Sequence, residues 1–246
     1  MGLYDLKYKK FGENSILVKW PSIIDENILK NILLFKSEIV KANLDLNIYV
    51  KTSYNSLLVT YLKKSVDSSK VNELKNIYKS IGSIKIQVFN KWTIPVCYDI
   101  SFGKDLVFLE KSLSIKKEEI ISLHASKDYR VYNIGFLPGF LYLGGMDSEI
   151  HHPRKEKPSL NIEKGAVGIG GSQTGIYPNK SPGGWHIIGR TPINLFDIEK
   201  ASPCLINSGD KVKFVSISLE QYQLISVQVE SNIYELNKTL IDDWSY

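Results

Sequence analysis

The chain has 246 residues, enough for one large domain or two small ones. Its hydrophobic content of 43% and charged content of 23% are those of an ordinary globular protein. The net charge of +5 comes from scattered lysines, so no nucleic-acid partner is expected. Two distant cysteines, Cys97 and Cys204, exclude a CxxC metal or redox motif and a disulfide scaffold.

The chain shows no pattern for export or membrane insertion. Residues 1–12, MGLYDLKYKKFG, lack the apolar core of a signal peptide. No run of about 18 consecutive apolar residues occurs, so no transmembrane helix and no membrane partner are expected. A cytoplasmic protein is the default expectation.

The first ninety residues predict a small α/β domain. Apolar residues at helical spacing predict helices over 25–42 and 68–80. Branched and alternating residues predict four strands, over 15–20, 46–51, 56–62 and 84–89. The order β-α-β-β-α-β is the ferredoxin-like arrangement, an antiparallel sheet with two helices on one face.

A boundary is expected near residue 90, which gives domains of residues 1–90 and 91–246. The second part predicts helices over 103–111 and 115–125 and a helical turn over 219–224. Its predicted strands are 93–99, 129–136, 193–198, 204–214, 214–218 and 225–235. Many short strands with glycine-rich connections are typical of a barrel or a sandwich.

Residues 135–191 form a block rich in glycine and proline. They hold 12 of the 17 glycines and five of the nine prolines, interleaved with aromatic residues. This composition predicts ordered turns and close backbone approaches around a concave site. The run Gly165–Gly171 matches neither GxGxxG nor a P-loop, so it predicts a strand followed by a turn at Gly170-Gly171.

All three arginines, Arg130, Arg154 and Arg190, lie in this block or just before it. A planar guanidinium suits a carboxylate or phosphate better than lysine does. Arg154 and Arg190 are therefore the main candidates for binding an anion. Ordinary structural ion pairs are the alternative for all three.

Polar residues in the block suggest recognition of a small ligand. The side chains of Gln173 and Thr174 and the amide of Gly175 can hydrogen-bond a carboxylate, an amide or a urea-like group. The sequence around Ser172 lacks the GxSxG pattern of a nucleophile elbow. Tyr177 and Trp185 fit either the core or a ligand wall.

The histidines allow two interpretations. His124, near the end of a predicted helix, either complements the helix dipole as a cation or acts as an acid or base at the mouth of a site. His151, His152 and His186 suggest a metal, but adjacent histidines point in different directions and no cysteine or spaced carboxylate completes the set. No metal site is therefore expected.

Several motifs occur in a fixed order: VCYD, FGKDL, GFLPGFLYLGGMD, HPRKEKP, GIGGSQTGIYP, SPGGWHIIGRTP and NLFD. Together they resemble the family of 5-oxoprolinase B subunits, also named allophanate-hydrolase subunit 1-like or Kip-type histidine-kinase inhibitor. The resemblance is strong over residues 92–216 and weak before them. Ser159 stands where the family usually has an arginine, which leaves Arg154 and Arg190 as the anion-binding candidates.

The resemblance implies a cyclophilin-like β-barrel after the N-terminal domain, and partners similar to the C and A subunits of 5-oxoprolinase. It implies ATP-dependent hydrolysis of 5-oxo-L-proline to L-glutamate by the complex, with ATP bound at an unknown place. This chain would supply half of a shared pocket and be inactive alone. The expected catalytic residues are His124 and Arg190, and the expected substrate-binding residues are Phe140, Arg154, Gln173, Thr174, Gly175, Tyr177 and Arg190.

Two other functions stay open. The chain could be a binding module that inhibits a sensor histidine kinase, which would need an exposed apolar docking surface rather than a polar pocket. A bare cyclophilin-like isomerase is disfavoured, because the arginine motif of that activity is not found.

Overall fold

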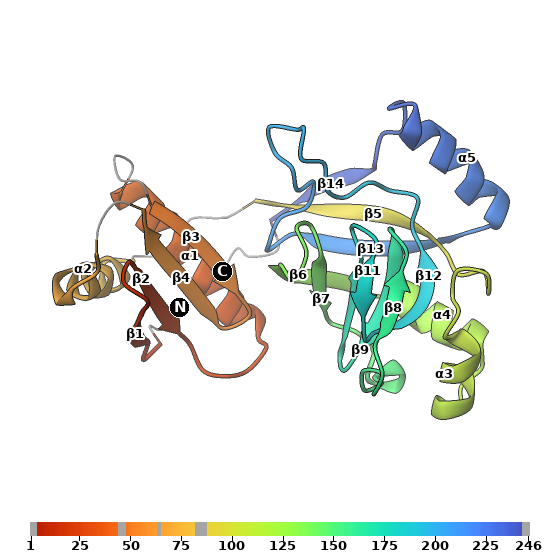
Figure 1. Cartoon of the computed structure of the whole chain (residues 1–246), viewed down its shortest axis with the longest axis horizontal. Helices are drawn as coiled ribbons and strands as arrows, with labels where there is room; N and C mark the ends of the chain where they lie inside the picture. The colour runs from red at the N-terminus through yellow and green to blue at the C-terminus, as the bar shows by residue number, and fades with distance from the viewer. Residues whose placement is uncertain (1–3, 44–47, 63–64, 82–87, 243–246) are drawn as a thin grey trace. The chain divides into compact units, whose positions relative to one another are not determined.

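The computed structural model describes residues 4–43, 48–62, 65–81 and 88–242. The chain divides into two compact units, Met1–Gln87 with Asp242–Tyr246 and Val88–Ile241 (Figure 1). The predicted boundary after residue 90 lies close to this division, just inside the first strand of the second unit. Each unit has its own hydrophobic core.

The first unit combines a four-stranded antiparallel sheet with two helices. The strands lie in the order β1 (Lys7–Phe11), β2 (Ser15–Lys19), β4 (Ser56–Tyr61) and β3 (Ile48–Ser53). The helices are α1 (Glu26–Ala42) and α2 (Ser68–Lys79), and the carboxylates of Asp25 and Asp67 cap their N-termini. Alternate strand residues pack with the apolar helix faces, so one side of the sheet is buried.

The expected α+β class is confirmed, whereas the ferredoxin-like assignment of the first unit stays a prediction. Residues 84–87, which make up most of the predicted fourth strand 84–89, lie outside the described residues. Strand β1, which was not predicted from the sequence, pairs with the edge of β2. The short, mostly charged sequence of β1 carries little apolar alternation, which is the signal that identifies a strand.

The second unit contains a closed barrel, consistent with the cyclophilin-like expectation. Its described strands follow the order β12-β9-β10-β7-β6-β13-β5, and β5 pairs back with β12 to close the ring. They are β5 (Phe89–Cys97), β6 (Asp128–Ile134), β7 (Leu141–Gly144), β9 (Ala166–Gly170), β10 (Gln173–Ile176), β12 (His186–Arg190) and β13 (Lys211–Ile217). Strand β14 (Lys238–Ile241) pairs with the start of β5, and β8 (Ser159–Ile162) pairs with β11 (Ser181–Gly183) in a separate ribbon.

Helices accompany the barrel and share its core. They are α3 (Leu106–Leu113), α4 (Lys117–Ser126), the short 3-10 helix η1 (Ser148–Ile150) and α5 (Leu219–Glu230). Buried side chains of α3 and α4 pack among the inward-facing residues of the strands. Among the helices that the structure describes, none has the length and apolar character needed to cross a membrane.

Four predicted strands near the C-terminus are corrected. Residues 193–198 form a loop, and the predicted strands 204–214 and 214–218 are replaced by the single strand β13 over Lys211–Ile217. The predicted strand over 225–235 is wrong, because α5 continues to Glu230. Ser218 and Gln221 form a capping box that starts this helix, and Ile225 and Val229, four residues apart, pack on the barrel core.

Candidate functional site

Arg190 lies at the seam where the barrel closes. It is paired with Ala166 of β9 on one side and with Cys97 of β5 on the other. Gly189 makes this approach possible, since a Cβ there would lie 2.8 Å from the Val96 side chain and 2.9 Å from the Cys97 carbonyl oxygen. The backbone therefore holds Arg190 rigidly while its side chain reaches outward.

The Arg190 guanidinium is anchored but not neutralised. Its Nε donates to the Lys164 carbonyl oxygen at 2.8 Å, and its carbon lies 5.6 Å from the centre of the Phe102 ring. Among the residues that the structure describes, no carboxylate lies within ion-pair distance of it. The outer guanidinium nitrogens are thus positioned to bind an anion.

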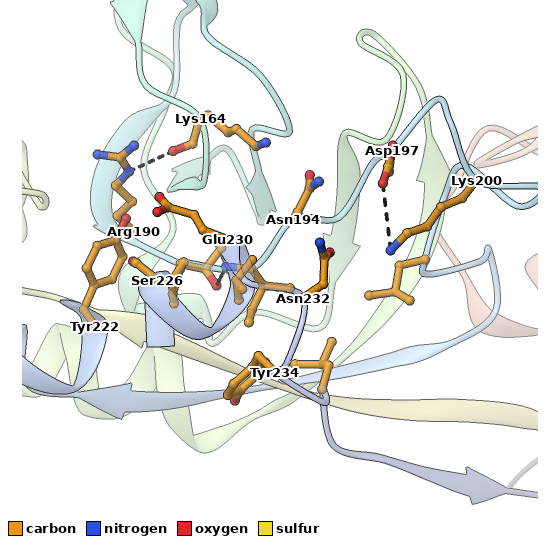
Figure 2. A pocket seen from close by; sticks show the side chains of 16 residues that line it. Lys164, Arg190, Asn194, Asp197, Lys200, Tyr222, Ser226, Glu230, Asn232 and Tyr234 are labelled. Atoms are coloured by element: carbon orange, nitrogen blue, oxygen red, sulfur yellow. Dashed lines mark hydrogen bonds and ion pairs between the residues drawn. The ribbon is translucent and has the colours of Figure 1, made fainter. Parts of the chain in front are cut away.

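A pocket of about 620 Å³, which we call the seam pocket, opens beside Arg190. Figure 2 shows Arg190 next to Tyr222 at one end and Asp197 with Lys200 at the other. The Oδ1 atom of Asn194 is buried and has no hydrogen-bond partner in the described structure, so one hydrogen-bond acceptor at the pocket wall is unused. The polar lining consists of Lys164, Arg190, Thr191, Asn194, Asp197, Lys200, Tyr222, Ser226, Glu230, Asn232 and Tyr234.

A second pocket, of about 330 Å³, also borders Arg190, and we call it the Asp105 pocket. The Asp105 carboxylate accepts from the Ile187 amide at 2.6 Å and pairs with Lys155 Nζ at 2.7 Å. Lys155 Nζ also donates to Ser159 Oγ at 3.2 Å. Asp105 therefore ties the start of α3, strand β12 and the loop after His152 into one rigid edge.

Phe140 and Tyr177 lie in an aromatic cluster rather than in either pocket. The Phe140 ring meets the rings of Tyr177 at 4.9 Å and Trp185 at 5.5 Å, both nearly perpendicular. Phe140 and Tyr177 are each only 1% exposed. Burial raises the pKa of Tyr177 to about 12, so its hydroxyl stays protonated. Both residues pack the fold, and the expectation that they contact a ligand stays a prediction.

Gly175 explains why this cluster can sit against the barrel. A Cβ at Gly175 would lie 2.4 Å from the Leu141 carbonyl oxygen and 2.9 Å from the Trp185 ring. Its backbone lies within the sheet between β7 and β9, and the expectation that its amide binds a ligand stays a prediction. Gln173 begins the same strand and lines neither the seam pocket nor the Asp105 pocket.

Arg154 is separated from Arg190 by the length of β12. Its guanidinium carbon lies 5.5 Å from the centre of the Trp185 ring, and the side chain is exposed. Trp185 immediately precedes β12, whereas Arg190 ends it, a distance of roughly 16 Å along an extended strand. The two arginines expected to bind anions therefore serve different places on the surface.

His124 and Thr174 lie together inside the core. His124 is 0% exposed, its Nδ1 lies 2.8 Å from the Tyr98 hydroxyl, and its Nε2 lies 2.8 Å from Thr174 Oγ1. Thr174 Oγ1 also donates to the Gly168 carbonyl oxygen at 3.0 Å. Burial lowers the pKa of His124 to about 3, so the ring is neutral at physiological pH. This corrects both expectations for His124, a cation at a helix end and a proton carrier at the mouth of a site.

The site contains residues that were not predicted from the sequence. Asp105, Lys155 and Asn194 lie within the quoted motifs FGKDL, HPRKEKP and NLFD, so the motifs contained a signal for them. Tyr222 and Ser226 come from α5, where the sequence suggested a turn and a strand, and no signal marked them. Arg130, by contrast, is buried and donates to the Gly209 carbonyl oxygen at 2.8 Å, which is a structural role.

Comparisons with known proteins place this architecture in a family. Residues 6–206 match the family model described as "Carboxyltransferase domain, subdomain C and D". The chain is 48% identical over 139 residues to the B subunit of Bacillus subtilis 5-oxoprolinase, which covers 56% of this chain and 57% of that protein. It is 47% identical over 127 residues to the B subunit of Haemophilus influenzae 5-oxoprolinase, which covers 52% of this chain and 60% of that protein.

The fold is also found in a solved structure. The urea amidolyase of Kluyveromyces lactis superposes with a TM-score of 0.81 at 18% identity, over 98% of this chain and 16% of that one. The matched segments span a little over half the length of the curated relatives. The resemblance to the 5-oxoprolinase B subunits is confirmed by these matches, and the chain belongs to the family of carboxyltransferase subdomains C and D.

Proposed function

We propose that this chain is the B subunit of an ATP-dependent 5-oxoprolinase, which hydrolyses 5-oxo-L-proline to L-glutamate together with chains similar to the A and C subunits. The observation that carries the proposal is the name shared by relatives that are 47–48% identical to this chain. The unpaired Arg190 guanidinium beside the seam pocket supports it, because the substrate carries a carboxylate.

The seam pocket matches the other polar groups of this substrate. The hydroxyls of Tyr222 and Ser226 can each donate and accept, so they can hydrogen-bond the lactam oxygen and the lactam N–H. Such contacts would hold the lactam in one orientation and stabilise charge that develops on its oxygen. We assign no nucleophile to this chain, and we expect it to be inactive alone.

ATP is assigned to the complex rather than to a motif of this chain. Residues 166–170 form strand β9, and Gly171 turns the chain with φ +66°. The backbone amides of this glycine run belong to a sheet ladder and a tight turn, which do not fit a phosphate cradle. The glycine run therefore gives no reason to place ATP on this chain.

The proposal is tested by reconstitution. The purified chain is mixed with chains similar to the A and C subunits, ATP and 5-oxo-L-proline, and L-glutamate is measured. We expect glutamate only in the complete mixture. Glutamate no higher than in the mixture without this chain would contradict the proposal.

Two arginine variants then test the site within the complex. Arg190→Ala should reduce the rate of glutamate formation at least a hundredfold while the melting temperature stays nearly unchanged, because the side chain is half-exposed. Arg154→Ala is the matched control, since its guanidinium also lacks an ion pair among the described residues but lines neither pocket. Equal losses in the two variants would place the anion site elsewhere.

Inhibition of a sensor histidine kinase and a cytoplasmic location stay predictions. A chain that binds a kinase but adds nothing to glutamate formation would support that alternative.

A further inference from the structure

A half-buried and a buried histidine meet beside the start of β12, at the opposite end of that strand from Arg190. His151 and His152 diverge, as adjacent residues do: His151 Nε2 lies 3.2 Å from the Met146 carbonyl oxygen. His152 instead turns toward β12, where its Nδ1 lies 3.2 Å from Nε2 of His186. The fold thus joins two histidines that are 34 residues apart in the sequence.

A third donor atom completes a triangle. The Pro153 carbonyl oxygen lies 3.0 Å from His152 Nδ1 and 3.0 Å from His186 Nε2. All three atoms are Lewis bases when His152 carries its ring proton on Nε2 and His186 carries its ring proton on Nδ1, and they lie 3.0–3.2 Å apart. Neighbouring ligands bound at about 2.1 Å from one metal ion are roughly 3.0–3.4 Å apart in octahedral or tetrahedral geometry. The triangle has the size of one face of a metal coordination shell.

The surroundings hold both rings in place. The backbones of His152 and Gly171 exchange two hydrogen bonds, at 2.7 and 3.2 Å. Ser112 Oγ lies 2.9 Å from His152 Nε2, so it can accept the proton of that nitrogen and leave Nδ1 free to bind a metal. The Phe108 ring stacks on His186 at 5.1 Å, with an angle of 6° between the rings. Little side-chain freedom remains to be lost on binding.

We propose that His152, His186 and the Pro153 carbonyl oxygen form a binding site for a divalent transition-metal ion of the zinc, nickel or copper type. Imidazole nitrogen favours these ions over Mg²⁺, which prefers oxygen ligands. In the described ranges no third histidine, cysteine or carboxylate joins the pair, so water completes the coordination shell. The nearby charges of Asp105 and Lys155 neutralise each other in an ion pair of 2.7 Å.

The site is independent of the proposed activity, because it lies at the start of β12 and Arg190 lies at its end. Tag-free protein is stripped with a chelator and titrated with Co²⁺, whose visible spectrum reports nitrogen ligands, and with Zn²⁺ by calorimetry. We expect one ion per chain with a micromolar Kd, and no binding of Mg²⁺. A hundredfold excess of Zn²⁺ over Kd should raise the melting temperature by about 5–10 °C.

The variants separate this site from other histidines. His152→Asn and His186→Asn should each weaken Co²⁺ binding at least tenfold, and Ser112→Ala should weaken it less, through loss of orientation. His151→Asn is the matched control and should bind as the unaltered chain does, because His151 lies outside the triangle. His152 is only half-buried, so its variant remains informative if the His186 variant does not fold.

Equal Co²⁺ affinity in the His151, His152 and His186 variants would overturn the proposal, as would a Co²⁺ spectrum showing oxygen ligands only. Binding at several weak sites per chain that no variant alters would likewise overturn it.

Discussion

The two faces of strand β10 are both buried, but different kinds of side-chain contact cover them. On one face, Thr174 points into the barrel core and contacts the neutral ring of His124. On the other, Gly175 leaves a flat surface on which Phe140 and Trp185 pack. The first face is held by a directed hydrogen-bond chain and the second by aromatic contact.

This difference shows what the motif GSQTGIY contributes. Because side chains alternate across a strand, the motif supplies two cores rather than one ligand-binding surface. In the proposed site, recognition falls to residues at the ends and edges of strands, above all Arg190, which lies at the barrel seam. The following predictions test how far the two faces of β10 differ.

The largest effect is expected on the aromatic face. Phe140→Ala should lower the free energy of unfolding by about 3–5 kcal/mol, since it removes a ring that is 1% exposed from the centre of the cluster. Urea unfolding followed by tryptophan fluorescence measures the loss. Phe136→Ala is the control: Phe136 touches the Phe140 ring but is 62% exposed, and a change within about 1 kcal/mol is expected. Equal losses would refute a cluster centred on Phe140.

A substitution at Gly175 tests whether the aromatic rings need the absence of a side chain at this position. Gly175→Ala should destabilise the chain by about 1–3 kcal/mol, because the new methyl would overlap the Leu141 carbonyl oxygen and the Trp185 ring. Gly184→Ala is the matched control, as its nearest neighbour would be 3.7 Å away, and it should change stability by about 0.5 kcal/mol or less. Melting temperatures of the two variants make the comparison. A Gly175 variant as stable as the Gly184 variant would show that the aromatic layer can shift freely.

The burial of His124 on the core face of β10 should make the free energy of unfolding depend on pH. The pKa of His124 is about 3 when folded and about 6.5 when unfolded, so the unfolded chain binds the proton more readily. The stability that the neutral ring contributes is therefore present above pH 6.5 and is lost as the pH falls toward 3. The slope approaches about 1.4 kcal/mol per pH unit. His124→Gln should reduce the slope of unfolding free energy between pH 6 and pH 4 by this amount, and an unchanged slope would contradict the burial of His124.

Much of the second unit could be predicted because its signals are local. The helices at 103–111 and 115–125, the strand and turn at Gly165–Gly171 and the strand at 129–136 correspond to α3, α4, β9 and β6. Apolar periodicity and glycine placement are properties of neighbouring residues, so the sequence displays them directly. Only the first half of α5 was predicted, as a helical turn over 219–224, because Ile225, Val227 and Val229 alternate as in a strand. The capping box at Ser218 and Gln221 favours a helix instead.

The site was harder to predict than the fold. The scarcity of arginine in the chain pointed to Arg190 as an anion-binding residue, which stays a prediction, and the structure places Arg190 beside a polar pocket. Phe140, Gly175 and Tyr177 were expected beside it, whereas Phe140 and Tyr177 lie in the aromatic cluster and Gly175 lies against it. The sequence analysis assumed that residues close in the sequence lie close in space. Side chains alternate between the two faces of a strand and the barrel closes on itself, so such residues can lie far apart.

By itself the sequence determined the α+β class, the motif-rich block and the resemblance to the 5-oxoprolinase B subunits, because these depend on residue order and local spacing. Only the tertiary structure decided that β12 meets β5 at Arg190, that His124 is sealed in the core, and that His152 meets His186. Each of these contacts joins segments far apart in the chain. Their partners are set by the packing of whole strands and helices, which no short stretch of sequence contains.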